Sequence, residues 1–234
     1  MKILEIDILT DNLNETEIYY SETLAFKIIA KNNDSITYDV GSSKLKFKKS
    51  FAVQPKYHFA FNIPNNKLEE AAEWASPKFK LLKVDGGNEI ADFNNWNAKA
   101  FYFLDNNDNV LEFIARFYLN NQSDKKFESS SIQSISEIGI VTDNVNEQAD
   151  NFIKEQNLNV YKNTSFENFV AIGNDSGLFI IVKTDRAWFP TDDRKAGKFF
   201  LRVKMQSNEQ IKEFLFNQSK LNTQNKSPLP HSQS

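Results

Sequence analysis

The sequence predicts an α+β protein assembled from strand–helix–strand–strand–strand (βαβββ) units. The first observation is an internal repeat: ILEIDILTDNLNE at Ile3–Glu15 returns as ISEIGIVTDNVNE at Ile135–Glu147, with nine of thirteen positions identical. The second is that each copy begins with apolar residues at alternate positions, typical of a half-buried strand, and continues into an amphipathic helix. The third is that three short strand-like runs follow each helix. Together they predict three complete units and the opening half of a fourth.

The first unit shows the pattern most clearly. Ile3–Thr10 alternates between two faces and is expected to form a strand. Asn12 or Asn14 is the candidate N-cap of a helix that runs to Leu24. Three strands are expected after this helix, at Phe26–Ala30, Ile36–Val40 and Lys44–Lys48.

The later units are expected to follow the same order. The second should contain a strand at Tyr57–Ile63, a helix at Lys67–Ser76, and strands at Lys80–Val84, Ala98–Leu104 and Val110–Phe117. The third should contain a strand from Ile135, a helix at Val145–Gln156, and strands near Leu158–Lys162, Phe169–Ile172 and Leu178–Lys183. The fourth is expected to stop after a strand at Phe199–Lys204 and a helix near Asn208–Asn217.

This order of units predicts two modules. Residues 1–118 are expected to form one complete module of two βαβββ units, and residues 135–218 a partial module of one unit plus a strand and a helix. The polar, serine-rich segment 119–134 is typical of a linker. The tail 219–234 is polar with two prolines and is expected to be disordered.

Composition excludes several classes of function. The chain of 234 residues has a net charge of −3, which gives no reason to expect a nucleic-acid partner. It contains no cysteine, so disulfides, thiolate metal sites and a cysteine nucleophile are excluded. No signal peptide and no apolar run of the length that spans a membrane is found, so we expect a cytoplasmic protein without a membrane partner.

Three sequence stretches resemble one known superfamily. YYSETLAF at Tyr19–Phe26 resembles the paired aromatic and Leu-Gly-Phe that end the first helix of this superfamily, with Ala25 in place of glycine. YHFAF at Tyr57–Phe61 resembles its fifth strand, and FLDNNDNVLE at Phe103–Glu112 resembles its last hairpin. The chain is therefore similar to the vicinal oxygen chelate superfamily, which includes glyoxalase I, extradiol dioxygenases, and fosfomycin and bleomycin resistance proteins.

The resemblance implies a fold and a metal site. Paired βαβββ units would form cup-shaped mixed sheets with helices on the convex face, and the second module would be incomplete. A divalent metal (Fe, Mn, Zn, Ni or Mg) would lie on the concave face, held by residues of the first, fifth and eighth strands. By position, these ligands would be Glu5, His58 and Glu112.

Each of these residues also has a simpler interpretation. His58 could be a hydrogen-bonded strand histidine, and Glu112 could pair with a lysine of the KLKFKK run at Lys44–Lys49. Glu5 stands where the superfamily usually has histidine, although one histidine with two carboxylates suits hard divalent ions. Further site residues are expected near this trio: Asp7 as a catalytic base on the face of Glu5, and Trp96 and Asn62 as substrate-binding residues.

The second module serves as an internal control. Glu137 matches Glu5, but the partial module has no clear counterpart of His58 and no strand to supply one of Glu112. We therefore expect no metal site around Glu137, which favours folding as the reason for the repeat. The segment Arg186–Pro190 could be a lid, a contact with a neighbouring chain, or a plain loop.

Two classes of function follow from the resemblance. The first is a metal-dependent lyase or isomerase, or a ring-cleavage dioxygenase, with one site in the first module and a small-molecule ligand. The alternative is a metal-free binding protein of the resistance type or a degenerate structural paralogue. A homodimer is a further expectation, because an unfinished sheet leaves strand edges that need cover.

Overall fold

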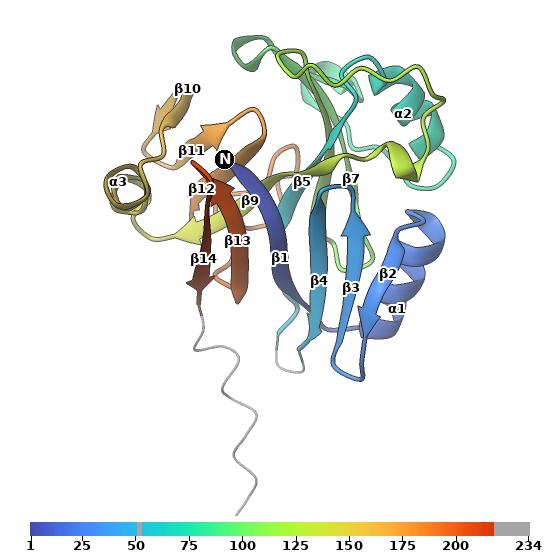
Figure 1. Ribbon diagram of the computed structural model, residues 1–234, viewed down its shortest axis with the longest axis horizontal. Coiled ribbons are helices and arrows are strands. Elements are labelled where there is room, and N and C mark those ends of the chain that lie inside the picture. Colours follow the sequence, from blue (N-terminus) through green and yellow to red (C-terminus); the bar gives the residue numbers. More distant parts are fainter. Residues whose placement is uncertain (51–52, 218–234) are drawn as a thin grey trace, which may run out of the picture.

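The computed structural model describes residues 1–50 and 53–217, and the predicted disordered tail lies outside this range. In the described part, fourteen strands form two curled sheets, and the helices are few (Figure 1). One sheet has eight strands in the order β10-β11-β12-β9-β5-β8-β7-β6, and the other has six in the order β14-β13-β1-β4-β3-β2. This confirms the α+β class. No helix of the described residues is long and apolar enough to cross a bilayer.

The elements follow the repeated unit. The first unit comprises β1 (Lys2–Thr10), α1 (Leu13–Ile18), a π-helical turn η1 (Tyr19–Thr23), β2 (Lys27–Lys31), β3 (Ser35–Val40) and β4 (Ser43–Lys49). The second comprises β5 (His58–Ile63), α2 (Leu68–Ala75), β6 (Ala91–Phe93), β7 (Ala98–Leu104) and β8 (Val110–Arg116), with 3-10 turns η2 (Asp85–Gly87) and η3 (Asn94–Trp96) beside β6.

The second half of the chain repeats this order and then departs from it. After the 3-10 turn η4 (Ser129–Ser131), the third unit comprises β9 (Ser134–Thr142), α3 (Val145–Gln156), β10 (Val160–Phe166), β11 (Phe169–Asn174) and β12 (Gly177–Lys183). Up to residue 217, where the described part ends, the fourth contributes β13 (Leu201–Ser207) and β14 (Gln210–Phe216). Helix α1 packs on β3 and β4, α2 on β7 and β8, and α3 on β11 and β12.

The units pair differently from the expectation. We expected the first and second units to share one cup, but β5 of the second unit pairs with β9 of the third, with Ala60 opposite Glu137. The first unit instead pairs with the two strands of the fourth, with Glu5 of β1 opposite Lys204 of β13. The expected partnership within residues 1–118 is therefore corrected, because β1 and β9 carry nearly the same sequence and each finds a partner outside its own half.

The repeated stretch folds in the same way in both copies. Each opening strand has a β-bulge one residue before its glutamate, at Leu4 in β1 and at Ser136 in β9. Each helix then has an asparagine N-cap whose side chain accepts from the backbone N–H three residues later, at 3.2 Å: Asn12 in one copy and Asn144 in the other. The two copies therefore share their local backbone geometry as well as their sequence.

Two predicted elements are wrong. Lys80–Val84 forms no strand, and the corresponding strand is β6. The predicted helix at Asn208–Asn217 is the strand β14, joined to β13 by a two-residue hairpin turn. Asn208 and Glu209 both have positive φ, 48° and 64°, as this tight turn requires. In the strand, Phe214 packs against Phe152 of α3, and this packing of an aromatic side chain favours the strand over a helix.

The predicted linker 119–134 packs on the second unit. Phe127 is buried, and its ring lies 5.7 Å from that of Trp74 on α2 and 6.2 Å from that of Phe113 on β8. Its backbone N–H also donates to the carboxylate of Glu70 at 3.1 Å. Phe127 thus anchors the segment in the core between α2 and β8.

The six-stranded sheet carries a cluster of charges around Asp7. Arg202 of β13 donates to Asp7 at 2.6 Å and to Glu5, and Lys48 of β4 lies 2.8 Å from the other oxygen of Asp7. Burial opposes ionisation of Asp7, but the hydrogen bonds from Arg202 and Lys48 outweigh it and lower its pKa.

This pairing predicts a pH-dependent contribution to stability. A carboxyl whose pKa is lower in the folded than in the unfolded state stabilises the fold above its unfolded pKa of about 3.9, and this contribution disappears as the pH falls through the folded value. Asp7→Asn is expected to lower the free energy of unfolding by about 1–3 kcal/mol at pH 7 and by much less at acid pH. Urea denaturation across this pH range measures the difference, with Asp150→Asn, which breaks an exposed ion pair, as the control. An equal loss at both pH values would contradict the prediction.

Candidate metal site and cavity

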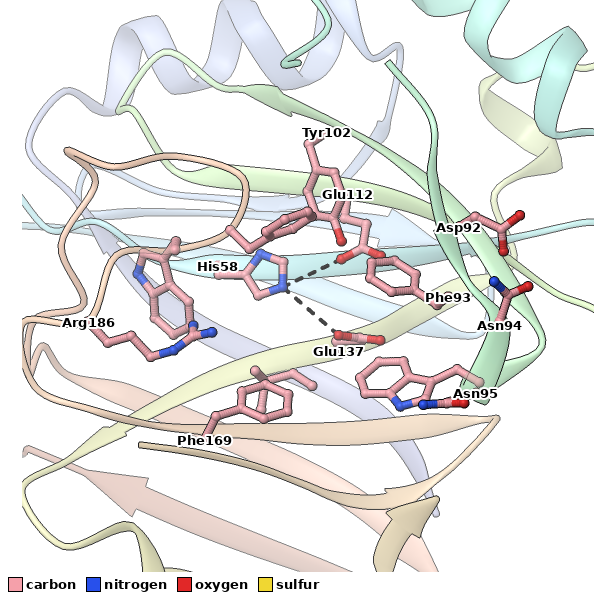
Figure 2. A pocket seen from close by; sticks show the side chains of 14 residues that line it. His58, Asp92, Phe93, Asn94, Asn95, Tyr102, Glu112, Glu137, Phe169 and Arg186 are labelled. Atoms are coloured by element: carbon pink, nitrogen blue, oxygen red, sulfur yellow. Dashed lines mark ion pairs between the residues drawn. The ribbon is translucent and has the colours of Figure 1, made fainter. Parts of the chain in front are cut away.

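Three buried polar side chains meet in the middle of the eight-stranded sheet. His58 of β5 points its Nε2 at Glu112 of β8, 3.6 Å from Oε2, and at Glu137 of β9, 3.9 Å from Oε2 (Figure 2). The three potential ligand atoms all lie within 4.8 Å of one another.

The strand order explains this meeting. Ala60 of β5 lies opposite Glu112 on one neighbouring strand and Glu137 on the other, so all three side chains occupy the same face. His58 is two residues away from Ala60 and shares that face. Because alanine is small, the space between the two glutamates stays open to the imidazole.

Neighbouring groups fix the orientation of each ligand candidate. The Nδ1 of His58 lies 3.0 Å from the carbonyl of Val110, which can only accept, so Nδ1 donates there and Nε2 faces the two glutamates. Tyr102 of β7 lies opposite Glu112 and donates its hydroxyl to it. Arg116 of β8 pairs with Oε1 of Glu137, which leaves Oε2 directed at His58.

Arg116 is a fully buried cation held from several sides. Its Nε donates to Ser136 at 3.2 Å and its guanidinium to the Tyr161 hydroxyl at 3.3 Å. The Trp96 and Tyr161 rings flank it, with centroids 5.6 and 5.5 Å from its central carbon. This enclosure gives Glu137 a rigid counter-charge.

The electrostatics of the cluster favour an additional cation. Burial raises the pKa of Glu112, and the nearby Glu137 raises it further, while Arg116 opposes both. Burial also raises the pKa of Tyr102, so its phenol stays protonated and serves as a donor. Two carboxylates therefore share one guanidinium in a buried place, where unbalanced negative charge is costly.

A cavity of about 600 Å³ opens above the cluster. One wall comes from β6 and the turn η3, and another from the segment between β12 and β13 (Figure 2). Its lining comprises His58, Asp92, Phe93, Asn94, Asn95, Trp96, Tyr102, Glu112, Glu137, Phe169, Ile180, Arg186, Trp188 and Phe189. The size suits a small organic molecule, and the walls are mainly aromatic around a polar base.

Trp188 depends on one difference between the two repeat copies. Its ring packs onto Gly139 of β9, where an added Cβ would come within 2.4 Å of the indole. The first copy has Asp7 at the equivalent position. The glycine thus admits the tryptophan beside His58, with ring centroids 5.4 Å apart, and lets it form a wall of the cavity.

Comparisons with solved structures identify the fold. No family model matches the sequence, and no curated protein matches it significantly. A candidate dioxygenase from Bacillus subtilis superposes with a TM-score of 0.57 at 12% identity, covering 92% of this chain and 84% of that one. A glyoxalase I variant from Zea mays superposes with a TM-score of 0.53 at 12% identity, covering 86% of this chain and 73% of that one. The chain has the vicinal oxygen chelate fold. Identities this low show the fold alone.

Within the vicinal oxygen chelate fold, the structure brings together only some of the expected residues. His58 and Glu112 lie in the cluster, and Trp96 lines the cavity. Glu5 and Asp7 lie in the other sheet, bound to Arg202, which corrects their expected places as ligand and base. The physical reason is the pairing of units, which puts β1 beside β13 and leaves β5 beside β9.

Asn62 also lies away from the cavity. It is 2% exposed, and its amide donates to Ser134 at 3.3 Å. Ile63 follows it at the end of β5, whereas His58, at the start of that strand, faces the cavity. Sharing a face with His58 was therefore not enough to bring Asn62 to the substrate position that we expected.

Sequence reasoning missed the third member of the cluster and its support. Glu137 carries the repeat signal, but the missing counterparts in its own module argued against it. Arg116 and Tyr102 gave no signal beyond their strand positions, and Trp188 was identified only as part of the segment Arg186–Pro190, which contributes to the cavity wall. The available clue was the similarity of the two opening strands, because it left open that the strand of Glu137 pairs with β5 of the second unit, which carries His58.

The six-stranded sheet contains a second cup in which an arginine replaces the histidine. Glu5 pairs with Lys204 of β13, and the equivalent Glu137 pairs with Ala60 of β5. Counting back two residues along each partner strand gives Arg202 in one cup and His58 in the other. The guanidinium of Arg202 binds Glu5 directly, so this cup contains its own cation.

The donor set of the first cup fits a divalent ion. It offers one imidazole lone pair and one oxygen from each of two carboxylates, and the second oxygen of Glu137 is already bound by Arg116. The position that could supply a fourth ligand is apolar. Ile180 of β12 pairs with Gly139, two residues after Glu137, in the same way that Glu112 pairs with Ala60, two residues after His58. A metal held here would have His58, Glu112 and Glu137 as its protein ligands, and all three line the cavity.

Proposed function

We propose that this protein is a divalent-metal-dependent enzyme that acts on a small molecule, with His58, Glu112 and Glu137 as the metal ligands. The convergence of these three side chains at the base of the cavity carries the proposal. Two buried carboxylates face one buried guanidinium, so with a neutral imidazole one negative charge is left over, which favours binding of a further cation.

The donor types favour hard ions. Two carboxylates and one imidazole suit Mn²⁺, Fe²⁺ or Mg²⁺ better than a site with several imidazoles or thiolates would, although Zn²⁺ and Ni²⁺ also bind such ligands. When bound, the ion would supply Lewis acidity toward a substrate oxygen. The chain's own groups would do the rest: Arg116 holds Glu137, Tyr102 donates to Glu112, and the aromatic walls bind the substrate and exclude water.

The reaction class that suits this site is a lyase or isomerase step, or ring cleavage by a dioxygenase. In the superfamily that the sequence resembles, substrates bind the metal through two adjacent oxygens, and a site with three protein ligands beside the apolar Ile180 would leave room for them. The solved structures of the same fold include a candidate dioxygenase and glyoxalase I, which is compatible with either step.

The first test is the metal content of the purified protein. We expect about one divalent ion per chain after incubation with Mn²⁺ or Fe²⁺, and its loss in His58→Ala. Elemental analysis after gel filtration measures both. The matched control is Asn62→Ala, a buried residue of the same strand outside the cavity. A wild-type protein that stays metal-free with Fe²⁺, Mn²⁺, Zn²⁺, Ni²⁺ and Mg²⁺ would contradict the proposal.

One observation favours a second candidate, a metal-free binding protein. Arg116 already pairs with Glu137, so part of the negative charge is balanced without an ion. In that case the cavity would bind a small molecule without chemistry. The same elemental analysis separates the two candidates, because this one requires no metal in the wild-type protein.

A further inference from the structure

The cavity contains an arginine, Arg186, that forms no ion pair with a described residue. The chain has four arginines, and all lie among the described residues. Three of them form ion pairs: Arg116 with Glu137, Arg194 with Asp108 and Asp193, and Arg202 with Glu5, Asp7 and Glu213. Among the ion pairs of the described residues, Arg186 has none.

Arg186 is built into the wall of the cavity. It is half-buried in the segment between β12 and β13, and Figure 2 shows its side chain at the left, reaching toward the middle of the cavity from the side of His58. Its guanidinium lies 5.3 Å from the centroid of the Phe169 ring, and its hydrogen bond to protein goes to the carbonyl of the adjacent Ala187, at 3.3 Å. The side chain is thus held in place, but most of its five N–H donors are not bound to any part of the chain that the structure describes.

The remaining walls define the other part of a ligand. Phe93 and Phe189 pack edge to face at 6.3 Å, and Trp96 and Trp188 complete an aromatic enclosure around the cluster. A flat apolar body would fit between these rings. A cation at one side of such an enclosure, itself partly removed from water, attracts an oxyanion on that body more strongly than an exposed cation would.

We propose that the ligand of this cavity is an aromatic oxyacid, whose carboxylate or phosphonate group is bound by Arg186 while its ring lies between the aromatic walls. This rests on the proposed function in so far as the cavity is the small-molecule site. It adds the chemical class of that molecule and a specificity-determining residue. Arginine matches both head groups, because its planar fork binds two oxygens at once.

Binding measurements on chelator-treated protein test this inference. Without metal, no anion can bind through an ion, so any preference for an anion comes from the protein. Isothermal titration calorimetry would compare phenylacetate, phenylphosphonate and the neutral phenylacetamide. We expect at least one of the two acids to bind wild-type protein about tenfold or more tighter than the amide, and the tighter acid identifies the head group. Arg186→Gln should bring acid and amide within about twofold of each other.

Two further variants make the result specific. Arg194→Gln removes a cation from the same segment but outside the cavity, and it should keep the full preference for the acid. Arg186→Lys keeps the charge without the fork and should keep part of it. Equal affinity for acid and amide in wild-type protein, or an unchanged preference in Arg186→Gln, would overturn the inference, as would the absence of binding by all three compounds in the low millimolar range. None of these results depends on the metal content, which tests the proposed function separately.

Discussion

Replacing Glu137 with glutamine is expected to lower the affinity for a divalent ion by at least about a hundredfold, while the same change at Glu5 leaves it unaltered. The two residues occupy the same place in the repeat and follow the same bulge, so the substitutions are matched in local structure. They differ in what faces them, which is His58 and Glu112 for one and Arg202 for the other. Titration with Mn²⁺, followed by calorimetry, measures the difference.

The Glu137 variant needs a control for folding, because glutamine leaves the buried Arg116 without its counter-charge. Glu137→Asp keeps that charge but shortens the side chain by one methylene, and it should fold while binding the ion more weakly. Circular dichroism on all variants establishes which are native. Comparable loss of metal in Glu5→Gln and Glu137→Gln would remove the basis for placing the site in the eight-stranded sheet.

Removing the guanidinium of Arg116 should be among the most destabilising single changes in the chain. Arg116→Met leaves Glu137 unpaired beside Glu112, and breaking a buried pair from one side typically costs about 3–5 kcal/mol of unfolding free energy. Arg194→Met breaks more exposed pairs and should cost about 1 kcal/mol or less. Urea denaturation of metal-free protein at neutral pH compares the two.

A double variant tests whether the loss of unfolding free energy comes from the unpaired carboxylate of Glu137. Arg116→Met with Glu137→Leu removes both partners, and we expect it to recover most of the stability lost in the single variant, as buried ion pairs often do when replaced by apolar side chains. If the double variant is as unstable as the single one, the loss would instead reflect the packing of Arg116 between Trp96 and Tyr161.

The sequence predicted the units of this fold better than their partnership. Alternation and helical spacing identified most strands and all three described helices, because these depend on neighbouring residues. Residues near Asn208–Asn217 were misread since Ile211, Phe214 and Leu215 fit helical spacing. The segment forms a strand because Asn208 adopts a positive φ in the hairpin turn and Phe214 packs on α3. Neither feature can be read from the sequence alone.

In the candidate site, too, the residues with local sequence signals were predicted and those that depend on long-range pairing were not. His58 and Glu112 were found because each sits in a local signature within the second unit. Glu137 was missed because its role depends on which of two nearly identical opening strands pairs with β5, and that choice is made over a long distance in the chain. Arg186 and Trp188 come from a loop whose path follows from the fold and not from its own sequence.

The first unit pairs with the fourth and the second with the third, and this determines the order in which the two sheets can form during translation. The two central units can close the eight-stranded sheet once the chain has emerged to Lys183, the end of β12. The first unit leaves the ribosome earliest, yet β1 must wait for β13, and the Glu5–Arg202 contact joins residues 197 positions apart. During translation, one edge of β1 would therefore stay open after the strands of the candidate site have emerged, until β13 is made.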